Sequence, residues 1–365
     1  ETLASLEDLY LPYRPKRHTR ASIAREKGLE PLAVRLMKQA GGNLLEMAQP
    51  FLNEEKGVLT AEDALAGARD IIAESASEHT GSRAGVRQLF ARKGVIASAP
   101  VAGKEEEGQK YRDYFDVQTP VSQAPSHRIL ALFRGEKEGV LALTIAPPPG
   151  EGVDLLERTF VRGRGADSEQ VRLAVHDGYQ RLLAPAMETE LRNDLKKRAD
   201  AEAIRVFADN VREVLMSSPL GQKRVLAIDP GFRTGCKVVC LDAQGALLHA
   251  TVIYPHPPQK ESEKARQLIT RLVSEYAIEA VAIGNGTAGR ETESLLREMD
   301  LPGVMVVSVN ESGASIYSAS AVAREEFPDY DVTVRGSVSI GRRLQDPMAE
   351  LVKIDPKSIG VGQYQ

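Results

Sequence analysis

The hydrophobic pattern of this chain changes at Pro219-Leu220-Gly221, and this change limits the folds that the sequence can adopt. Before it, apolar residues recur mainly at the 3.6-residue spacing of amphipathic helices. After it, short β-rich runs such as V-L-A-I at 225–228 are bounded by turn residues. A chain of 365 residues also exceeds the usual size of one domain. We therefore predict a multidomain protein with a mainly α N-terminal half followed by an α/β part.

Residues 1–220 are predicted to form the helical region. Thr19 and Thr60 are suited to cap helices that begin directly after them, and Ser82 is suited to cap the next helix. Between residues 94 and 165 the periodicity is irregular and includes two β-rich runs. We therefore expect a small strand-containing insert near 94–165, after which the helical pattern returns.

The sequence after residue 221 predicts strands that alternate with helices. The expected strands lie at 224–228, 236–241, 246–254, 279–283 and 304–309, and the last two helices at 312–326 and 337–352. Short turns join the first three strands, which predicts antiparallel pairing, whereas helices separate the later ones, which predicts parallel pairing. This order of elements is that of the ribonuclease-H-like mixed sheet.

The composition excludes several classes of protein. The 47 basic and 51 acidic residues give a net charge of −4, so the chain as a whole lacks the basic surplus common in nucleic-acid binders. Cys236 and Cys240 alone cannot supply four zinc ligands, and their spacing on a strand predicts two buried thiols. No apolar run is long enough to span a membrane. We expect a cytoplasmic protein with no membrane partner.

Three acidic residues are candidates for a shared site. In the ribonuclease-H-like arrangement, an acid at the end of the first, central strand helps to hold divalent metal, and Asp229 occupies that place. Mg²⁺ and Mn²⁺ need further oxygen ligands, for which Glu311, after the fifth strand, and Asp346, on the last helix, are the candidates. We expect these carboxylates to converge as catalytic and metal-binding residues, although each can also be explained as a turn former or a helix-dipole partner. The sequence requires no other cofactor.

Basic residues near the predicted sheet end and near the N-terminus are the candidate contacts to nucleic-acid phosphates. Arg233 and Lys237 follow Asp229 closely, and Arg290 comes directly after a glycine-rich loop whose amides can meet an anion. The candidate set is Arg233, Lys237, Arg290, Arg342, Arg343, Arg14, Lys16, Arg17 and Arg20. The alternative for each is a solvated charge without a ligand.

Four stretches resemble the bacterial Tex family of transcription accessory proteins. They are L-E-D-L-Y-L-P-Y-R-P-K-R-H-T-R-A at 6–21, A-I-D-P-G-F-R-T-G-C-K at 227–237, N-E-S-G-A-S-I-Y-S-A-S at 310–320 and S-I-G-R-R-L-Q-D-P-M-A-E-L-V-K-I-D-P-K-S-I-G-V-G-Q-Y at 339–364. The resemblance covers essentially the whole chain.

This resemblance implies a domain organisation. Residues 1–220 would be the family's helical N-terminal region, and residues 221–353 its YqgF domain, a relative of the Holliday-junction resolvase RuvC. Residues 354–365 would begin the helix-hairpin-helix region. Members of the family continue into helix-hairpin-helix repeats and an OB-fold RNA-binding domain, so we expect this chain to be a fragment that lacks both.

One position departs from the pattern of the resolvases and bears on whether the domain is a nuclease. RuvC-like resolvases carry a Glu at the end of the fourth strand, where this chain has Gly284-Asn285. The resemblance therefore favours an RNA-binding transcription accessory factor that acts as a scaffold and whose ribonuclease-H-like domain is inactive. The alternatives are a divalent-metal-dependent nuclease or junction resolvase, and a protein-interaction module that docks on RNA polymerase. In each case RNA or DNA would be bound mainly by the domains absent from this chain.

Overall fold

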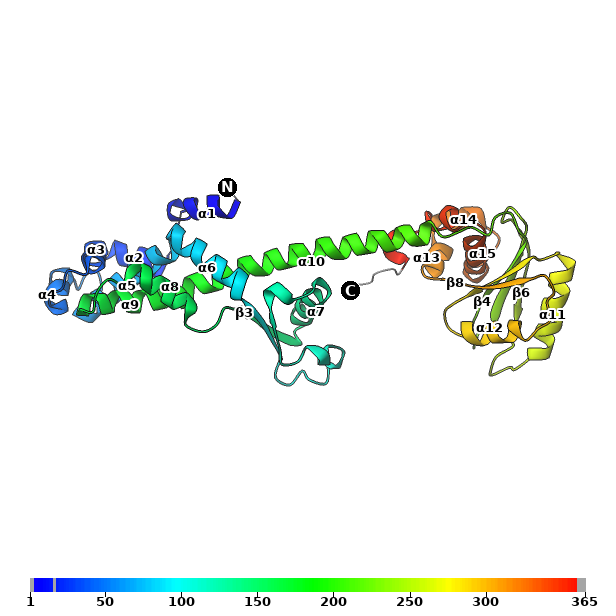
Figure 1. The fold of residues 1–365 in the computed structure, drawn as a ribbon, viewed down its shortest axis with the longest axis horizontal. Helices are drawn as coiled ribbons and strands as arrows, with labels where there is room; N and C mark the ends of the chain where they lie inside the picture. The colour runs from blue at the N-terminus through cyan, green and yellow to red at the C-terminus, as the bar shows by residue number, and fades with distance from the viewer. Residues whose placement is uncertain (1–2, 16–17, 360–365) are drawn as a thin grey trace. The chain divides into compact units, whose positions relative to one another are not determined.

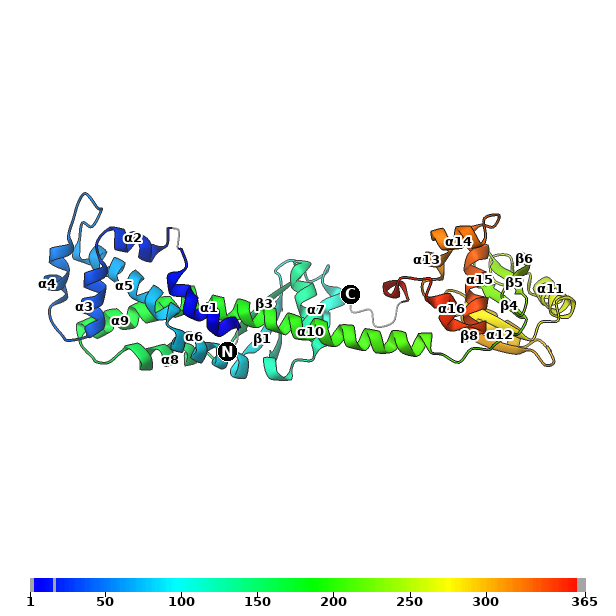
Figure 2. The ribbon, with the colours of Figure 1, turned by 90° about the horizontal axis from the view of Figure 1, so that it is seen from above.

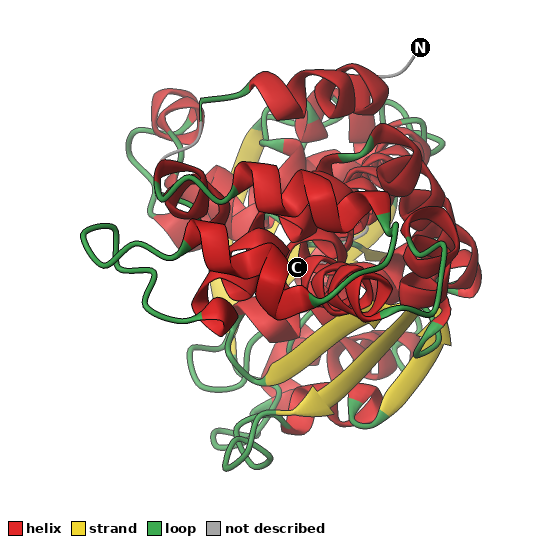
Figure 3. Cartoon of the chain, turned by 90° about the vertical axis from the view of Figure 1, so that its left-hand side faces the viewer, coloured by secondary structure: helices red, strands yellow, loops and turns green. Residues whose placement is uncertain are grey.

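The computed structural model describes residues 3–15 and 18–359. The chain divides into two compact units at about residue 203, inside the long helix α10 (Ala184–Leu215). Helices predominate over strands (Figure 3). The mainly helical first half and the later mixed sheet agree with the fold class predicted from the sequence.

The first unit is built around packed helices. Its elements are α1 (Leu3–Tyr10), α2 (Arg20–Glu26), α3 (Glu30–Lys38), α4 (Leu44–Ala48), α5 (Ala61–Glu78), α6 (Thr80–Lys93), α7 (Ser126–Lys137), α8 (Glu151–Phe160), α9 (Ala166–Asp177), a π-helical turn (Gly178–Leu183) and the first part of α10. Helices α3, α5 and α9 pack side by side (Figures 1 and 2). Their apolar stripes, which include Leu32, Leu36, Ile72 and Val171, form one continuous core.

Two of the expected helix caps are confirmed and one is wrong. The Thr19 hydroxyl accepts from the Ser22 amide at the start of α2, and Thr60 forms a reciprocal capping box with Asp63 at the start of α5. Helix α6, however, begins three residues before the place that Ser82 would cap. Its N-cap is His79, whose Nδ1 accepts from the Ser82 amide at 3.2 Å, so an imidazole performs the role expected of a hydroxyl.

The first unit also contains a three-stranded sheet. Strand β1 (Val95–Pro100) lies between β2 (Val117–Pro120) and β3 (Leu141–Ala146), and both pairings are antiparallel. Strand β2 was not predicted, because its four residues are too few for an alternating pattern. Helix α7 and part of α10 pack against this sheet and close a separate small core.

The second unit contains a mixed five-stranded sheet in the order β6-β5-β4-β7-β8. Its strands are β4 (Val225–Asp229), β5 (Cys236–Leu241), β6 (Leu247–Ile253), β7 (Ala280–Gly284) and β8 (Met305–Val309). Strands β4, β5 and β6 form an antiparallel meander, whereas β7 and β8 run parallel to β4. The carboxyl ends of β4, β7 and β8 therefore lie at one end of the sheet.

Helices cover both faces of this sheet (Figure 1). One face packs against α11 (Ser262–Glu275) and α12 (Gly289–Arg297), and both cysteine thiols are buried there. The other face packs against α15 (Val332–Gln345) and the segment that contains α13 (Ala314–Ala319) and α14 (Ala321–Glu326). This layering explains the continuous apolar runs of the central strands, since both of their faces are buried.

The last helical segment differs from the sequence-based prediction of one helix over 337–352. Helix α15 begins at Val332, where the Asp331 carboxylate accepts from the Thr333 and Val334 amides. It ends at Gln345, and a separate short helix α16 (Pro347–Leu351) follows. Asp346 lies between them with an extended backbone, because a residue that precedes proline disfavours the helical conformation.

Candidate functional site

Asp229 occupies the carboxyl end of the central strand β4. Its neighbour across the antiparallel pair is Lys237 of β5, and Gly336 of α15 lies over it: a Cβ built on Gly336 would be 3.6 Å from Asp229 Oδ2. Burial raises the pKa of Asp229, and the positive charge of Lys237 offsets this only in part. The carboxylate is therefore held at the end of the sheet in an environment that disfavours its charged form.

Glu311 meets Asp229 at this end of the sheet. It follows β8. Strand β8 is parallel to β7, and β7 is parallel to β4, so the two acids lie at the same end of the sheet. Burial raises the pKa of Glu311, and the nearby charge of Asp229 raises it further, while the Gly286 amide and Arg343 act in the opposite direction. Glu311 Oε2 is buried and has no hydrogen-bond partner in the described part of the chain. The two carboxylates thus form a half-buried pair.

Two glycines make room for the Glu311 carboxylate. A Cβ at Gly284 would overlap its Oε2, and a Cβ at Gly286 would overlap its Oε1. Neither glycine has a positive φ, so space and not backbone conformation requires glycine here. From the sequence we interpreted this loop as a place where amides could meet an external anion; the anion next to it is the chain's own Glu311.

Asn285, between these glycines, holds the backbone of the neighbouring strand end. Its side-chain Oδ1 accepts from the backbone amide of Glu311 at 3.3 Å, and its backbone amide donates to the Val309 carbonyl at 3.0 Å. This is the position at which the resemblance to resolvases implies a Glu. The side-chain oxygen of Asn285 is thus engaged in fixing the loop that carries Glu311.

Asp346 does not join the pair. Its carboxylate is exposed and accepts from the Ala349 amide at 3.0 Å as the N-cap of α16. Helix α15 runs from Gly336, beside Asp229, to Gln345, whose Nε2 donates to the carbonyls of Lys223 and Asp242 at 2.7 Å each. Lys223 precedes β4 and Asp242 follows β5, so both lie at the end of the sheet opposite to Asp229. The ten helical residues from Gly336 to Gln345 span about 15 Å. Asp346 therefore does not converge with Asp229 and Glu311, contrary to our expectation for the three carboxylates.

The donor set around Asp229 suits one hard cation. Two carboxylates with raised pKa values and one orphaned oxygen are the features that a divalent ion would satisfy. Within residues 3–15 and 18–359, however, no cluster of three or more His, Cys, Asp or Glu side chains is arranged to hold a metal. Two-metal hydrolysis needs ligands for two ions about 3.5–4 Å apart, which this pair does not provide.

The predicted basic contacts fall into different environments. Arg233 is exposed in the loop after β4, Arg290 is exposed in the first turn of α12, and Lys237 Nζ donates to the carbonyls of Thr234 and Gly235. Arg342 is engaged internally, with bonds to the Gly245 carbonyl and Glu326. In the first unit, Arg14 and Arg20 are exposed, whereas Lys16 and Arg17 lie outside the described residues.

Arg343 is buried, which the sequence did not predict. Arg343 is 5% exposed, and its Nη1 donates to the carbonyls of Asn310 and Ser312 at 2.8 Å each. The guanidinium thus fixes the turn that carries Glu311. Buried Glu350 also lies near enough to raise the pKa of Arg343, although burial lowers it on balance. Because its partners are distant in sequence, only the folded structure identifies Arg343 as a residue that positions Glu311.

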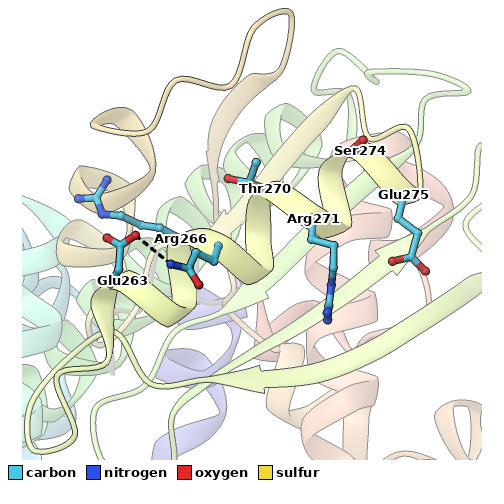
Figure 4. Close-up of a pocket in the computed structure, with 7 residues that line it drawn as sticks. Glu263, Arg266, Thr270, Arg271, Ser274 and Glu275 are labelled. Atoms are coloured by element: carbon cyan, nitrogen blue, oxygen red, sulfur yellow. Dashed lines mark hydrogen bonds between the residues drawn. The ribbon is translucent and has the colours of Figure 1, made fainter.

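A second hollow on this unit does not involve these residues. It follows the outer face of α11, where Glu263, Arg266, Thr270, Arg271 and Glu275 project outward (Figure 4). The lining carries two acidic and two basic side chains, and a single helix supplies it. This face is therefore a solvated helix surface.

Two family models match most of this chain. A family model described as the Tex protein YqgF-like domain matches residues 223–345, and one described as Tex central region-like matches residues 43–207. The chain belongs to the Tex family. It is 45% identical to "Protein tex" of Bordetella pertussis and 46% identical to "Protein YhgF" of Escherichia coli, over 100% and 99% of this chain and 48% of each relative.

A more distant relative extends the comparison. The human "S1 RNA-binding domain-containing protein 1" is 33% identical over 100% of this chain and 38% of its own length. The chain thus spans about half, or less, of the lengths of these relatives. Within the described residues, no helix is both long and apolar enough to cross a membrane.

Proposed function

We propose that this chain is the scaffold portion of an RNA-binding transcription accessory factor, and that its ribonuclease-H-like domain binds at most one divalent cation without cleaving nucleic acid. The Tex relatives, one of which is named "Transcriptional accessory protein Tex", support the transcriptional role. The relative named for an S1 RNA-binding domain supports RNA as the nucleic acid. RNA polymerase, as part of the transcription machinery, remains the proposed protein partner.

The observation that carries this proposal is that two carboxylates meet at the sheet end, while the third is used elsewhere. Asp229 and Glu311 share one site, whereas Asp346 caps α16. The remaining side-chain oxygen, on Asn285, accepts from the Glu311 amide. A single cation held by two carboxylates can position a phosphate, but it leaves either the attacking or the leaving oxygen without a metal.

A nuclease is the second candidate, and one observation favours it. The pair formed by Asp229 and Glu311 lies at the place where enzymes of this fold hold their metal, and Arg233 and Arg290 are exposed nearby. Nucleic acid could supply further oxygen ligands through its own phosphates. The two candidates differ in whether bound substrate is cut.

The deciding experiment is a cleavage assay with Mn²⁺ on single strands, duplexes and four-way junctions. Wild-type chain is compared with Asp229→Asn and, as a matched control, Asp346→Asn, which keeps a side chain able to cap α16. We expect equal, near-background signals from all three. Cleavage by the wild type and by Asp346→Asn that is lost in Asp229→Asn would overturn the scaffold proposal and establish the nuclease.

Binding of the cation is tested separately by isothermal titration with Mn²⁺. We expect one weak site in the wild type and in Asp346→Asn, and none in Asp229→Asn. Two sites in the wild type would contradict the proposal of a single cation.

A further inference from the structure

Strand β8 forms one edge of the five-stranded sheet, and its outward backbone groups form no hydrogen bond within residues 3–15 and 18–359. The Met305 amide donates to the Glu279 carbonyl at 3.1 Å, and the Asn285 amide donates to the Val309 carbonyl at 3.0 Å. In a parallel ladder these bonds direct the amides and carbonyls of alternate residues, Met305, Val307 and Val309, toward β7. The amides and carbonyls of Val306 and Ser308 therefore point away from the sheet.

Nothing in the described part of the chain occupies this edge. Strand β8 packs on β7, α12 and α15, and no hydrogen bond to the outward groups of Val306 or Ser308 is formed by residues 3–15 or 18–359. The strand sequence M-V-V-S-V contains neither a charged residue nor a proline, the features that commonly protect an edge from pairing. Met305 is 53% exposed and Ser308 is exposed as well.

A pocket lies directly beside this edge. Its volume is about 190 Å³, and β8 and the residues that follow it form one wall. The opposite walls come from the end of α10 and from the segment around α16. The apolar lining includes Val214, Val307, Val309, Leu351 and Ile359. This space suits one aliphatic side chain from a chain that runs along β8, and it has no room for a second sheet with its covering helices.

The charge of the pocket favours one kind of ligand. Arg343 is the only charged side chain among the described residues that line it, and its Nε and Nη2 have no hydrogen-bond partner. Glu311 and Glu350 lie near enough to offset part of this positive charge. Asn310, Ser217 and Ser312 add uncharged polar groups. Because Arg343 Nε and Nη2 are donors that lack an acceptor within the described residues, a carboxylate next to the aliphatic side chain is better matched than a basic group.

We propose that the outer edge of β8 and the adjoining pocket bind an extended peptide segment of a partner protein. The segment adds to the sheet as a further strand through the outward groups of Val306 and Ser308. One aliphatic side chain enters the pocket, and an acidic neighbour lies toward Arg343. Backbone pairing supplies affinity and the pocket supplies specificity, as in other proteins that bind a peptide by strand addition. This role goes beyond the nucleic-acid role proposed above, and the two surfaces share Arg343, which also fixes the turn that carries Glu311.

Two substitutions separate strand addition from other modes of binding. Ser308→Pro removes the outward amide but no bond to β7, since proline is tolerated at such edge positions. Ser217→Trp fills the pocket from an exposed position two residues after α10 without altering the sheet. The matched control is Met216→Trp, at a neighbouring exposed residue that does not line the pocket.

The probe is a random 12-residue peptide library, selected on the intact 365-residue chain. Affinities of the selected peptides are measured by fluorescence anisotropy, and circular dichroism confirms that each variant is folded. We expect Ser308→Pro and Ser217→Trp each to weaken binding at least tenfold, and Met216→Trp to change it less than twofold. Bound peptide should also slow hydrogen exchange of the Val306 and Ser308 amides at least tenfold.

The proposal is overturned if selection yields no peptide above background, or if the selected peptides bind both variants as tightly as the wild type. It is also overturned if the selected peptides leave exchange at Val306 and Ser308 unchanged. Peptides that retain full affinity after methylation of alternate backbone nitrogens would contradict strand addition in the same way, because the methyl groups prevent backbone pairing.

Discussion

Gly286 and Glu311 approach each other so closely that a Cβ on the glycine would overlap Oε1 of the carboxylate. The Gly286 amide also lowers the pKa of Glu311, against the larger effect of burial. A Cβ on Gly284 would likewise overlap Oε2 of the same carboxylate. The carboxylate is therefore confined by the last residue of β7 and by the loop that follows it, and its position depends on residues that carry no side chain.

Gly286→Ala should displace the Glu311 carboxylate and lower stability. Added methyl groups in confined sites typically cost about 1–3 kcal/mol, and we expect a loss in this range in urea-induced unfolding. Thr287→Ala, at the exposed neighbouring position, is the matched control and should change stability by less than about 0.5 kcal/mol. Equal stabilities of the two variants would show that the loop can move aside.

Asp229→Asn should stabilise the chain at pH 7 in the absence of divalent cations. Burial raises the pKa of Asp229 in the folded state, so the folded protein binds its proton more tightly than the unfolded chain does. Stability of the wild type should therefore decrease as the pH rises from the unfolded pKa, about 3.8–3.9, through the raised folded pKa. The advantage of Asn should fade as the pH falls below that window.

Urea titrations of the wild type and Asp229→Asn between pH 3.5 and 7.5 measure this difference. Asp300→Asn, at an exposed position, serves as the control and should follow the wild type at every pH. A wild type that is more stable than Asp229→Asn at pH 7 would mean that the carboxylate is stabilised by its surroundings, contrary to its burial beside Glu311.

Asp346→Ala should destabilise the chain without altering the sheet-end pair. Loss of an N-cap side chain costs about 0.5–2 kcal/mol, and the Asp346 carboxylate caps α16 through the Ala349 amide. Asp346→Asn should retain most of the stability, since Asn caps about as well as Asp. If both variants lost Mn²⁺ binding, Asp346 would have to be returned to the cation site.

The chain alone should bind nucleic acid weakly, because its net charge is −4. We expect a dissociation constant no tighter than about 10⁻⁶ M for a generic oligonucleotide at physiological salt. At low salt, Arg290→Ala should reduce the salt dependence of binding by about one unit of log–log slope if Arg290 contacts a phosphate. Arg266→Ala, on α11 and paired with Glu298, is the control. Submicromolar binding by the wild type would contradict this expectation.

The meeting of Asp229 and Glu311 follows from features that a sequence contains. Asp229 ends one apolar strand and Glu311 comes two residues after another, and the connections through helices predict that these strands run parallel. The burial of Arg343 could not be predicted in this way, because its carbonyl partners at Asn310 and Ser312 are reached only when α15 packs on the sheet. The same holds for the position of Gly336 over Asp229.

The wrong prediction for Asp346 has a different cause, since the sequence contains the signal for a helix break at this residue. An Asp before Pro disfavours helical backbone and is suited to cap a helix that begins at the proline. We interpreted residues 337–352 as one helix because their apolar spacing is nearly continuous across Asp346-Pro347. Periodicity describes which face is buried and not whether the backbone is unbroken, so the local signal should have had priority here.

Helix α15 contacts two distant parts of its unit at once. Near its start Gly336 lies on Asp229, and at its other end the carbonyls of Leu344 and Gln345 accept from the Leu220 and Gly221 amides. Leu220 and Gly221 belong to the segment that follows α10. An axial shift of α15 would therefore alter the space around the two carboxylates and the path of the chain leaving α10 in a single movement. The close contact of Gly341 with Ala227 and Leu241 leaves room for only small shifts of this kind.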